Sequence, residues 1–142
     1  MEFFVQANLA SGIDHMFVIL DSPGQEGQPE VAEMLRAHPH VTLARCNRSW
    51  WVTGRPARLN VRQRINANWV RELLAPFPWA EWLFHIDGDE VVRLDDDALA
   101  AVPATTNTVS LQTLEAVSEM EPEQRRPLRF KRQLDAEELN LL

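Results

Sequence analysis

The sequence predicts an α/β fold in which helices cover both faces of a mostly parallel sheet. Short apolar, β-branched runs alternate along the chain with segments whose apolar residues recur every three or four positions. Clusters of Gly, Pro, Asp and Ser mark turns between them. A chain of 142 residues, 45% of them hydrophobic, is long enough for one core and too short for two. We therefore expect residues 1–142 to form a single domain.

The first half of the chain contains two predicted helix–strand pairs. Apolar residues in "EFFVQANLASG" fit a helix that ends at Gly12, because glycine commonly ends helices. The run "HMFVIL" (15–20) predicts a buried strand, which the turn "DSPGQEG" follows. The segment "PEVAEMLRAH" predicts a helix with a proline near its first turn, and "VTLAR" (41–45) predicts a second strand.

The second half continues the alternation. From Leu59 to Leu74 apolar positions recur mainly every four residues, which predicts a long amphipathic helix. The run "WLFHI" (82–86) predicts a third buried strand, and "TVSLQTL" (108–114) predicts a further strand with alternating polarity. Between them, aspartates precede a helix that starts near Asp95. Ligands of such sheets gather at the carboxyl ends of the strands, so we expect the site there.

Composition limits the partners and the compartment. The net charge of −7 argues against a nucleic-acid-binding protein, which would carry a basic excess. No apolar run approaches the length of a membrane span, and the N-terminus lacks the basic region of a signal peptide. The lone Cys46 is compatible with a reducing compartment. The sequence therefore predicts a cytoplasmic protein without a membrane segment or a nucleic-acid partner.

Positive charge is concentrated in one segment of this acidic chain. Seven of the fourteen basic residues lie between Arg45 and Arg71, and no acidic residue lies among them. Arginines bind phosphate oxygens, and a cation held by carboxylates binds others. The distribution therefore favours a phosphate-bearing ligand, and we expect some of these arginines to face the acidic strand ends.

The stretch "WLFHIDGDE" places three carboxylates directly after a predicted strand. Asp87 and Asp89 are two residues apart, so in extended backbone their side chains leave on the same side, while Gly88 lets the chain bend. Magnesium and manganese prefer carboxylate oxygens and are typically held by one or two of them together with phosphates and water. The spacing favours a metal site, and the alternative is an acidic turn.

Three segments together resemble a known family: "LASGIDHMFVILDSPGQEG", "RQRINANWV" and "WAEWLFHIDGDEVV". In order and spacing they are similar to nucleotide-sugar-dependent glycosyltransferases of the family 2 type. The resemblance implies a GT-A fold, which is Rossmann-like with a mostly parallel sheet flanked by helices. It also implies a divalent cation, Mn²⁺ or Mg²⁺, at the D-x-D motif. The implied reaction transfers a sugar from a nucleotide-diphosphate sugar to a hydroxyl of a sugar or glycan acceptor.

The resemblance assigns roles to individual residues. Asp21 matches the family aspartate that usually meets the nucleoside of the donor. Asp87 matches the first aspartate of the D-x-D motif, expected near the ribose or the metal, and Asp89 matches the second, expected to be the direct metal ligand. Gln63 and Asn66 lie on the predicted long helix, where family members often carry polar residues facing the donor. The alternative for these two is an exposed helix face.

The chain also departs from the family pattern. Family members open with a strand that is absent here, and they continue past "FKR" into an acceptor-binding region. We therefore expect the chain to be incomplete at both ends. Glu90 fits the acidic residue that commonly follows the D-x-D motif. For the carboxylate base of an inverting transfer, the candidates are Glu115 and Glu119.

Several other residues are expected to be structural, and two other functions stay open. We expect His85 in the core, and Trp50 and Trp51 there too, with stacking on a ligand as the alternative for the two tryptophans. We expect Cys46 to be inert. One alternative function is a truncated, non-catalytic module that binds a nucleotide or a partner. The other is a different metal-dependent, phosphate-handling enzyme, although the chain has no glycine-rich phosphate loop and no lysine before Lys131.

Overall fold

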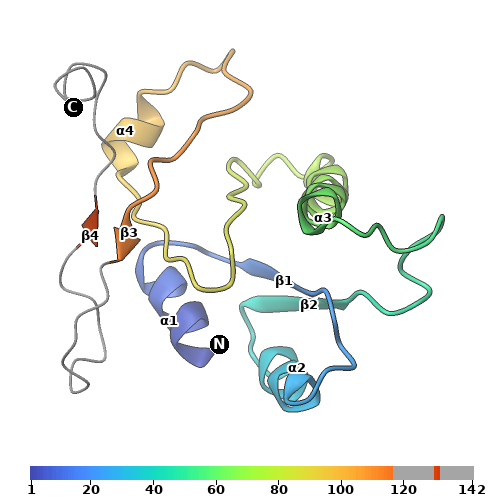
Figure 1. Ribbon diagram of the computed structural model, residues 1–142. Helices are drawn as coiled ribbons and strands as arrows, with labels where there is room; N and C mark the ends of the chain where they lie inside the picture. Colours follow the sequence, from blue (N-terminus) through green and yellow to red (C-terminus); the bar gives the residue numbers. More distant parts are fainter. Residues whose placement is uncertain (117–129, 132–142) are drawn as a thin grey trace, which may run out of the picture. The chain divides into compact units, whose positions relative to one another are not determined.

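The protein is represented by a computed structural model that describes residues 1–116 and 130–131 (Figure 1). The chain divides into two compact units, Met1–Asp96 and Asp97–Leu142, which are described separately. In the described part of the chain, no helix is both long enough and apolar enough to cross a membrane.

The first unit contains the predicted helices and strands of the first half of the chain and the long helix. They are α1 (Glu2–Ala10), β1 (Met16–Leu20), α2 (Gln28–Arg36), β2 (Val41–Arg45) and α3 (Leu59–Leu74). Strands β1 and β2 lie side by side and are parallel, in a register that runs from Met16 opposite Val41 to Leu20 opposite Arg45 (Figure 1). A parallel pair needs a crossover connection, which α2 provides. The structure is therefore α/β, as the sequence predicts.

Helix α1 ends at Ala10, and the glycine predicted to end it, Gly12, follows two residues later. The amide of Gly12 donates to the carbonyl of Leu9 and the amide of Ile13 donates to the carbonyl of Asn8, each at 3.2 Å. These two bonds form a Schellman motif, which satisfies carbonyls that the helix end leaves free. Gly12 has φ of 101°, a conformation that residues with a side chain rarely adopt.

The core of this unit lies between α1, α2 and the two strands. Its buried apolar residues are Phe4, Val5, Met16, Leu20, Ala32, Leu35 and Val41. Full burial of a side chain of this size stabilises the fold by about 1.5–3 kcal/mol. This cluster fixes the positions of the two strand ends, after which Asp21 and Cys46 follow.

Two predicted strands are wrong. Residues 82–86 and 108–114 have no regular secondary structure. In residues 83–86 the side chains still alternate, with Phe84 and Ile86 half-buried and Leu83 and His85 exposed. Apolar alternation favours an extended backbone, but a strand also needs a neighbour for its N–H and C=O groups. Within the described residues β1 pairs only with β2.

The prediction that His85 lies in the core is wrong for the same reason. Its side chain is exposed, because no sheet forms around residues 82–86 to cover it. The helix predicted near Asp95 is present as the short α4 (Asp96–Ala100). In the second unit, β3 (Glu115–Ala116) and β4 (Phe130–Lys131) form an antiparallel pair.

Candidate functional site

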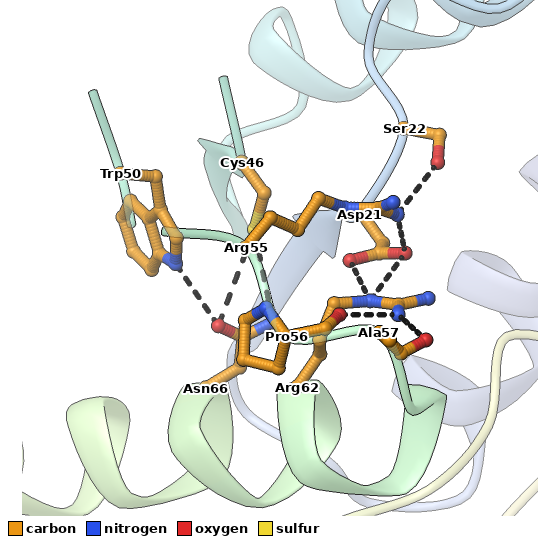
Figure 2. A network of polar contacts seen from close by, with 9 residues as sticks. All are labelled: Asp21, Ser22, Cys46, Trp50, Arg55, Pro56, Ala57, Arg62 and Asn66. Atoms are coloured by element: carbon orange, nitrogen blue, oxygen red, sulfur yellow. Dashed lines mark hydrogen bonds and ion pairs between the residues drawn. The ribbon is translucent and has the colours of Figure 1, made fainter. Parts of the chain in front are cut away.

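Helix α3 connects the segments that follow the two strands. Three of its polar residues contact three different parts of the first unit: Arg62 contacts Asp21, Gln63 contacts Asp87, and Asn66 contacts Trp50. Figure 2 shows the contacts of Arg62 and Asn66 above the helix. Asp21 directly follows β1, so its contact with Arg62 lies at the carboxyl end of the sheet, where a ligand site is expected.

Arg62 holds Asp21 in place. Its Nε donates to both carboxylate oxygens of Asp21, at 2.9 and 3.1 Å. Its Nη1 donates to the carbonyls of Pro56 and Ala57, at 2.9 and 2.8 Å (Figure 2). The Arg62 side chain is only 10% exposed. A buried charge needs such pairing and hydrogen bonding, so this contact is a fixed part of the structure.

Arg55 makes a second and more exposed contact with Asp21. Its Nη2 donates to Asp21 Oδ2 at 2.6 Å and to the hydroxyl of Ser22 at 3.2 Å (Figure 2). The Arg55 side chain is 44% exposed. Two arginines of the basic segment therefore face the carboxylate at the end of a strand. This confirms the expectation for the acidic segment that follows β1, whereas the contact of α3 with Asp87 is made by Gln63 and not by an arginine.

An open hollow of about 440 Å³ lies beside this cluster. The turn after β1 and the residues that follow β2 form its walls, which are lined by Asp21, Ser22, Pro23, Gly24, Gln25, Cys46, Asn47 and Arg55. Its polar groups include carboxylate, hydroxyl, amide and guanidinium. The hollow therefore offers both donors and acceptors to a small ligand.

Asn66 lies inside the protein. Only 8% of the residue is exposed. Trp50 Nε1 donates to Asn66 Oδ1 at 3.0 Å, and Asn66 Nδ2 donates to Cys46 Sγ at 3.7 Å. The Trp50 ring also packs against the Trp69 ring, with 6.0 Å between the centroids. Asn66 thus joins the segment after β2 to α3 rather than presenting its amide on an exposed helix face.

Trp51 is buried, as predicted, whereas Trp50 is half-buried. Cys46 is buried as well. Burial raises the pKa of the Cys46 thiol, and the carboxylate of Asp21 adds to this effect. The hydrogen bond with Asn66 and the charges of Arg55 and Arg62 act in the opposite direction. Because the thiolate is the reactive form, a raised pKa favours an inert thiol at neutral pH.

Residues 87–90 form a closed turn in contact with α3. Gln63 Nε2 donates to Asp87 Oδ1 at 2.7 Å. The amide of Asp87 donates to Glu90 Oε2 at 2.8 Å, and the amide of Glu90 donates to the Asp87 carbonyl at 3.1 Å. Glu90 thus closes the turn, whereas Asp87 and Asp89 are exposed.

The carboxylates of this turn fit a magnesium or manganese ion only as a partial ligand set. Among the described residues there is no group of three or more His, Cys, Asp or Glu side chains that could hold a metal ion by themselves. Asp87 and Asp89 provide two exposed carboxylates, and Mg²⁺ is commonly held by one or two carboxylates with phosphate oxygens and water. The pair therefore suits a cation that arrives with a phosphate ligand.

The sequence reasoning did not identify Asn8, which holds the segment that follows the D-x-D turn. Asn8 is fully buried. Its Nδ2 donates to the carbonyls of Phe4 and Glu90, each at 3.0 Å, and its Oδ1 accepts from the amide of Val92 at 2.9 Å. The sequence contains one signal for this role. Asn8 lies four and three residues after Phe4 and Val5, on the same buried face of α1, and a polar residue on such a face needs a hydrogen-bond partner.

Of the two candidate bases, Glu115 is exposed and pairs with Lys131 in the second unit, at 3.4 Å. Glu119 lies outside the described residues. Comparisons with protein-family models, with curated proteins and with solved structures find no match to the chain.

Proposed function

We propose that this protein is a glycosyltransferase with a GT-A fold that depends on a divalent metal. It transfers a sugar from a nucleotide-diphosphate sugar to a hydroxyl of a sugar or glycan acceptor, and residues 1–96 supply the donor site. The observation that carries the proposal is the convergence on α3. Adjacent residues of this helix, Arg62 and Gln63, contact Asp21 and Asp87, the two carboxylates assigned to the donor by the resemblance.

Each residue has a role in this proposal. Asp21, at the wall of the hollow, accepts hydrogen bonds from the nucleoside. Gln63 positions Asp87, and Asp87 and Asp89 hold Mn²⁺ or Mg²⁺. When bound, the cation would neutralise charge on the diphosphate leaving group. We place this activity in the cytoplasm, where a single buried thiol stays reduced.

One alternative is favoured by a specific observation. Asp21 already accepts hydrogen bonds from two arginines, and Asn66 is used inside the protein. Such engagement suits a module that binds a nucleotide or a partner without turnover. The two functions differ in turnover, because only the transferase would release a nucleoside diphosphate from a nucleotide-diphosphate sugar, and this release would require Asp89.

Calorimetry with a panel of nucleoside diphosphates, with and without Mn²⁺, tests the proposal. We expect Mn²⁺ to raise the affinity of at least one nucleotide, because Asp87 and Asp89 would hold the cation and its charge would attract the phosphates. Asp89→Asn should remove this gain. The matched control is Asp14→Asn, which changes an exposed aspartate before β1. Equal affinity with and without Mn²⁺ would contradict the metal site.

A further inference from the structure

The two arginines that contact Asp21 differ in how firmly they are held. Arg62 makes four hydrogen bonds, two to the carboxylate and two to backbone carbonyls, and is 10% exposed. Arg55 makes one bond to the carboxylate and one to Ser22, and is 44% exposed. Exposed ion pairs are weak because water competes for both partners, whereas breaking a buried pair leaves an uncompensated charge. Of the two, Arg55 is therefore the arginine that can be released.

Arg55 also supplies a positive charge that Asp21 does not need. Arg62 alone neutralises the Asp21 carboxylate through both of its oxygens. The charged groups that act on the neighbouring Cys46 thiol are one carboxylate, Asp21, and two guanidinium groups, Arg55 and Arg62. The cluster of Asp21, Arg55 and Arg62 thus carries one positive charge in excess. Of its two arginines, Arg55 lines the hollow and Arg62 does not.

We propose that Arg55 is an exchangeable arginine, which leaves Asp21 for the phosphate groups of a ligand that enters the hollow. Arg62 keeps Asp21 in position during this exchange. A guanidinium group binds phosphate oxygens through paired hydrogen bonds, and a diphosphate carries more charge than one carboxylate. The assignment of the ligand as the diphosphate of a sugar donor rests on the proposed function. The exchange of Arg55 between Asp21 and a phosphate group does not depend on that assignment.

Calorimetry with inorganic pyrophosphate, in buffer without divalent cations, tests the exchange directly. We expect Arg55→Ala to weaken pyrophosphate binding about tenfold or more, because a hydrogen-bonded charge is lost. We expect Asp21→Asn to tighten it about two- to fivefold, because Arg55 no longer has a carboxylate to leave. If Asp21 itself contacted pyrophosphate, Asp21→Asn would weaken binding. If Asp21 competes with pyrophosphate for Arg55, Asp21→Asn tightens binding, so the direction of the change in affinity distinguishes the two cases.

Two control variants separate this effect from a general change of charge. Arg48→Ala removes a charge from the same segment as Arg55, and Glu26→Gln removes one from the same turn as Asp21. Both residues are exposed, and both variants should stay within about twofold of the wild type. The proposal is overturned if Asp21→Asn binds no tighter than Glu26→Gln, or if Arg55→Ala binds as well as Arg48→Ala.

A measurement on the wild-type protein covers the case in which Asp21→Asn does not fold. The side-chain NMR signal of Arg55 is identified by its absence in Arg55→Ala. This signal should shift on addition of pyrophosphate, and an unchanged signal overturns the exchange. Pyrophosphate binding is measured without metal and without a substitution at Asp89, so it does not depend on the proposed cation site. Loss of manganese-dependent nucleotide binding therefore tests the proposed function, and the pyrophosphate series tests Arg55.

Discussion

At the scale of single residues, Asn8 provides the contacts that a neighbouring strand would otherwise supply. A strand offers its partner one acceptor and one donor, and the Asn8 amide offers both to residues 90–92. This contact fixes the backbone directly after the D-x-D turn. The position of Asp87 and Asp89 therefore depends on a helix that is about eighty residues earlier in the chain.

Substitution of Asn8 should destabilise the first unit strongly. Asn8→Ala leaves the Val92 amide and the Glu90 carbonyl without their partner, and we expect a loss of about 2–4 kcal/mol in the free energy of unfolding. Urea denaturation measures this loss. The matched control is Gln6→Ala, an exposed amide on the same helix, which should change stability by less than about 0.5 kcal/mol. Equal effects of the two variants would contradict the role of Asn8.

The raised pKa of Cys46 predicts a pH dependence of stability. The folded thiol keeps its proton to a higher pH than the unfolded thiol, whose ordinary pKa is 9.0. The folded state therefore binds more protons in the range just above this value, and the free energy of unfolding falls as pH rises. Below pH 9.0 the thiol keeps its proton in both states, so the contribution of Cys46 to the free energy of unfolding is fully present.

Urea denaturation between pH 8 and about 10.5 measures this loss, because the range spans the unfolded thiol pKa. The chain has no tyrosine and a single lysine, Lys131, so few other groups titrate there. Cys46→Ala should lose less stability than the wild type over the same range. Parallel curves for the two proteins would show that burial does not perturb the thiol.

Residue-level sequence reasoning found part of the site. It placed Asp21 and Asp87 at positions where a ligand is expected, and it selected Gln63, which contacts Asp87. It did not identify Arg62 as the partner of Asp21, because a charged residue on a helix predicts exposure unless its partner is known. The burial of Asn66 was missed for the same reason, since its partners Trp50 and Cys46 are distant in sequence.

At the scale of elements, the helices could be predicted from residues within each segment, whereas the pairing of the strands could not. The long helix begins at Leu59 and ends at Leu74 as its apolar spacing predicts, and α1 ends two residues before the predicted glycine. Helices satisfy their own backbone groups, so a sequence pattern within one segment suffices to predict them. The segment 82–86 has the pattern of a strand, but its pairing depends on a neighbour elsewhere in the chain.

Gly12 gives a test of the end of α1. Because Gly12 has φ of 101°, Gly12→Ala should cost about 1–2 kcal/mol in the free energy of unfolding. Gly24→Ala is the matched control, since nothing lies within 4 Å of the added methyl group and the Gly24 backbone does not have positive φ. Thermal unfolding measures both variants. If both variants unfold at the wild-type temperature, Gly12 is not needed to end the helix.

At the scale of the whole molecule, the candidate site lies within one of the two units. The core, the two-stranded sheet, the hollow and the D-x-D turn all belong to residues 1–96. A unit with its own core can fold by itself. The candidate site therefore depends on contacts between residues that are distant in sequence but belong to this unit. Composition and charge favour a phosphate ligand, but they do not predict which of these contacts form its site.

A fragment of residues 1–96 should consequently fold and bind pyrophosphate. We expect cooperative urea denaturation of this fragment and a pyrophosphate affinity within about threefold of the full chain. The control is a fragment of residues 1–58, which lacks α3 and therefore Arg62, the buried partner of Asp21. We expect no cooperative transition for this shorter fragment. Loss of cooperativity in residues 1–96 would show that the unit is not independent.

The pair of indole rings at the site has an optical consequence. Trp50 belongs to the same segment as Arg55, whereas Trp69 belongs to α3, and their ring centroids are 6.0 Å apart. Two chromophores at this separation share their electronic excitation and give a paired band of opposite signs in circular dichroism. Movement of the Arg55 segment away from α3 would uncouple the rings. The protein therefore carries an intrinsic spectroscopic reporter for the position of this segment, which needs no added label.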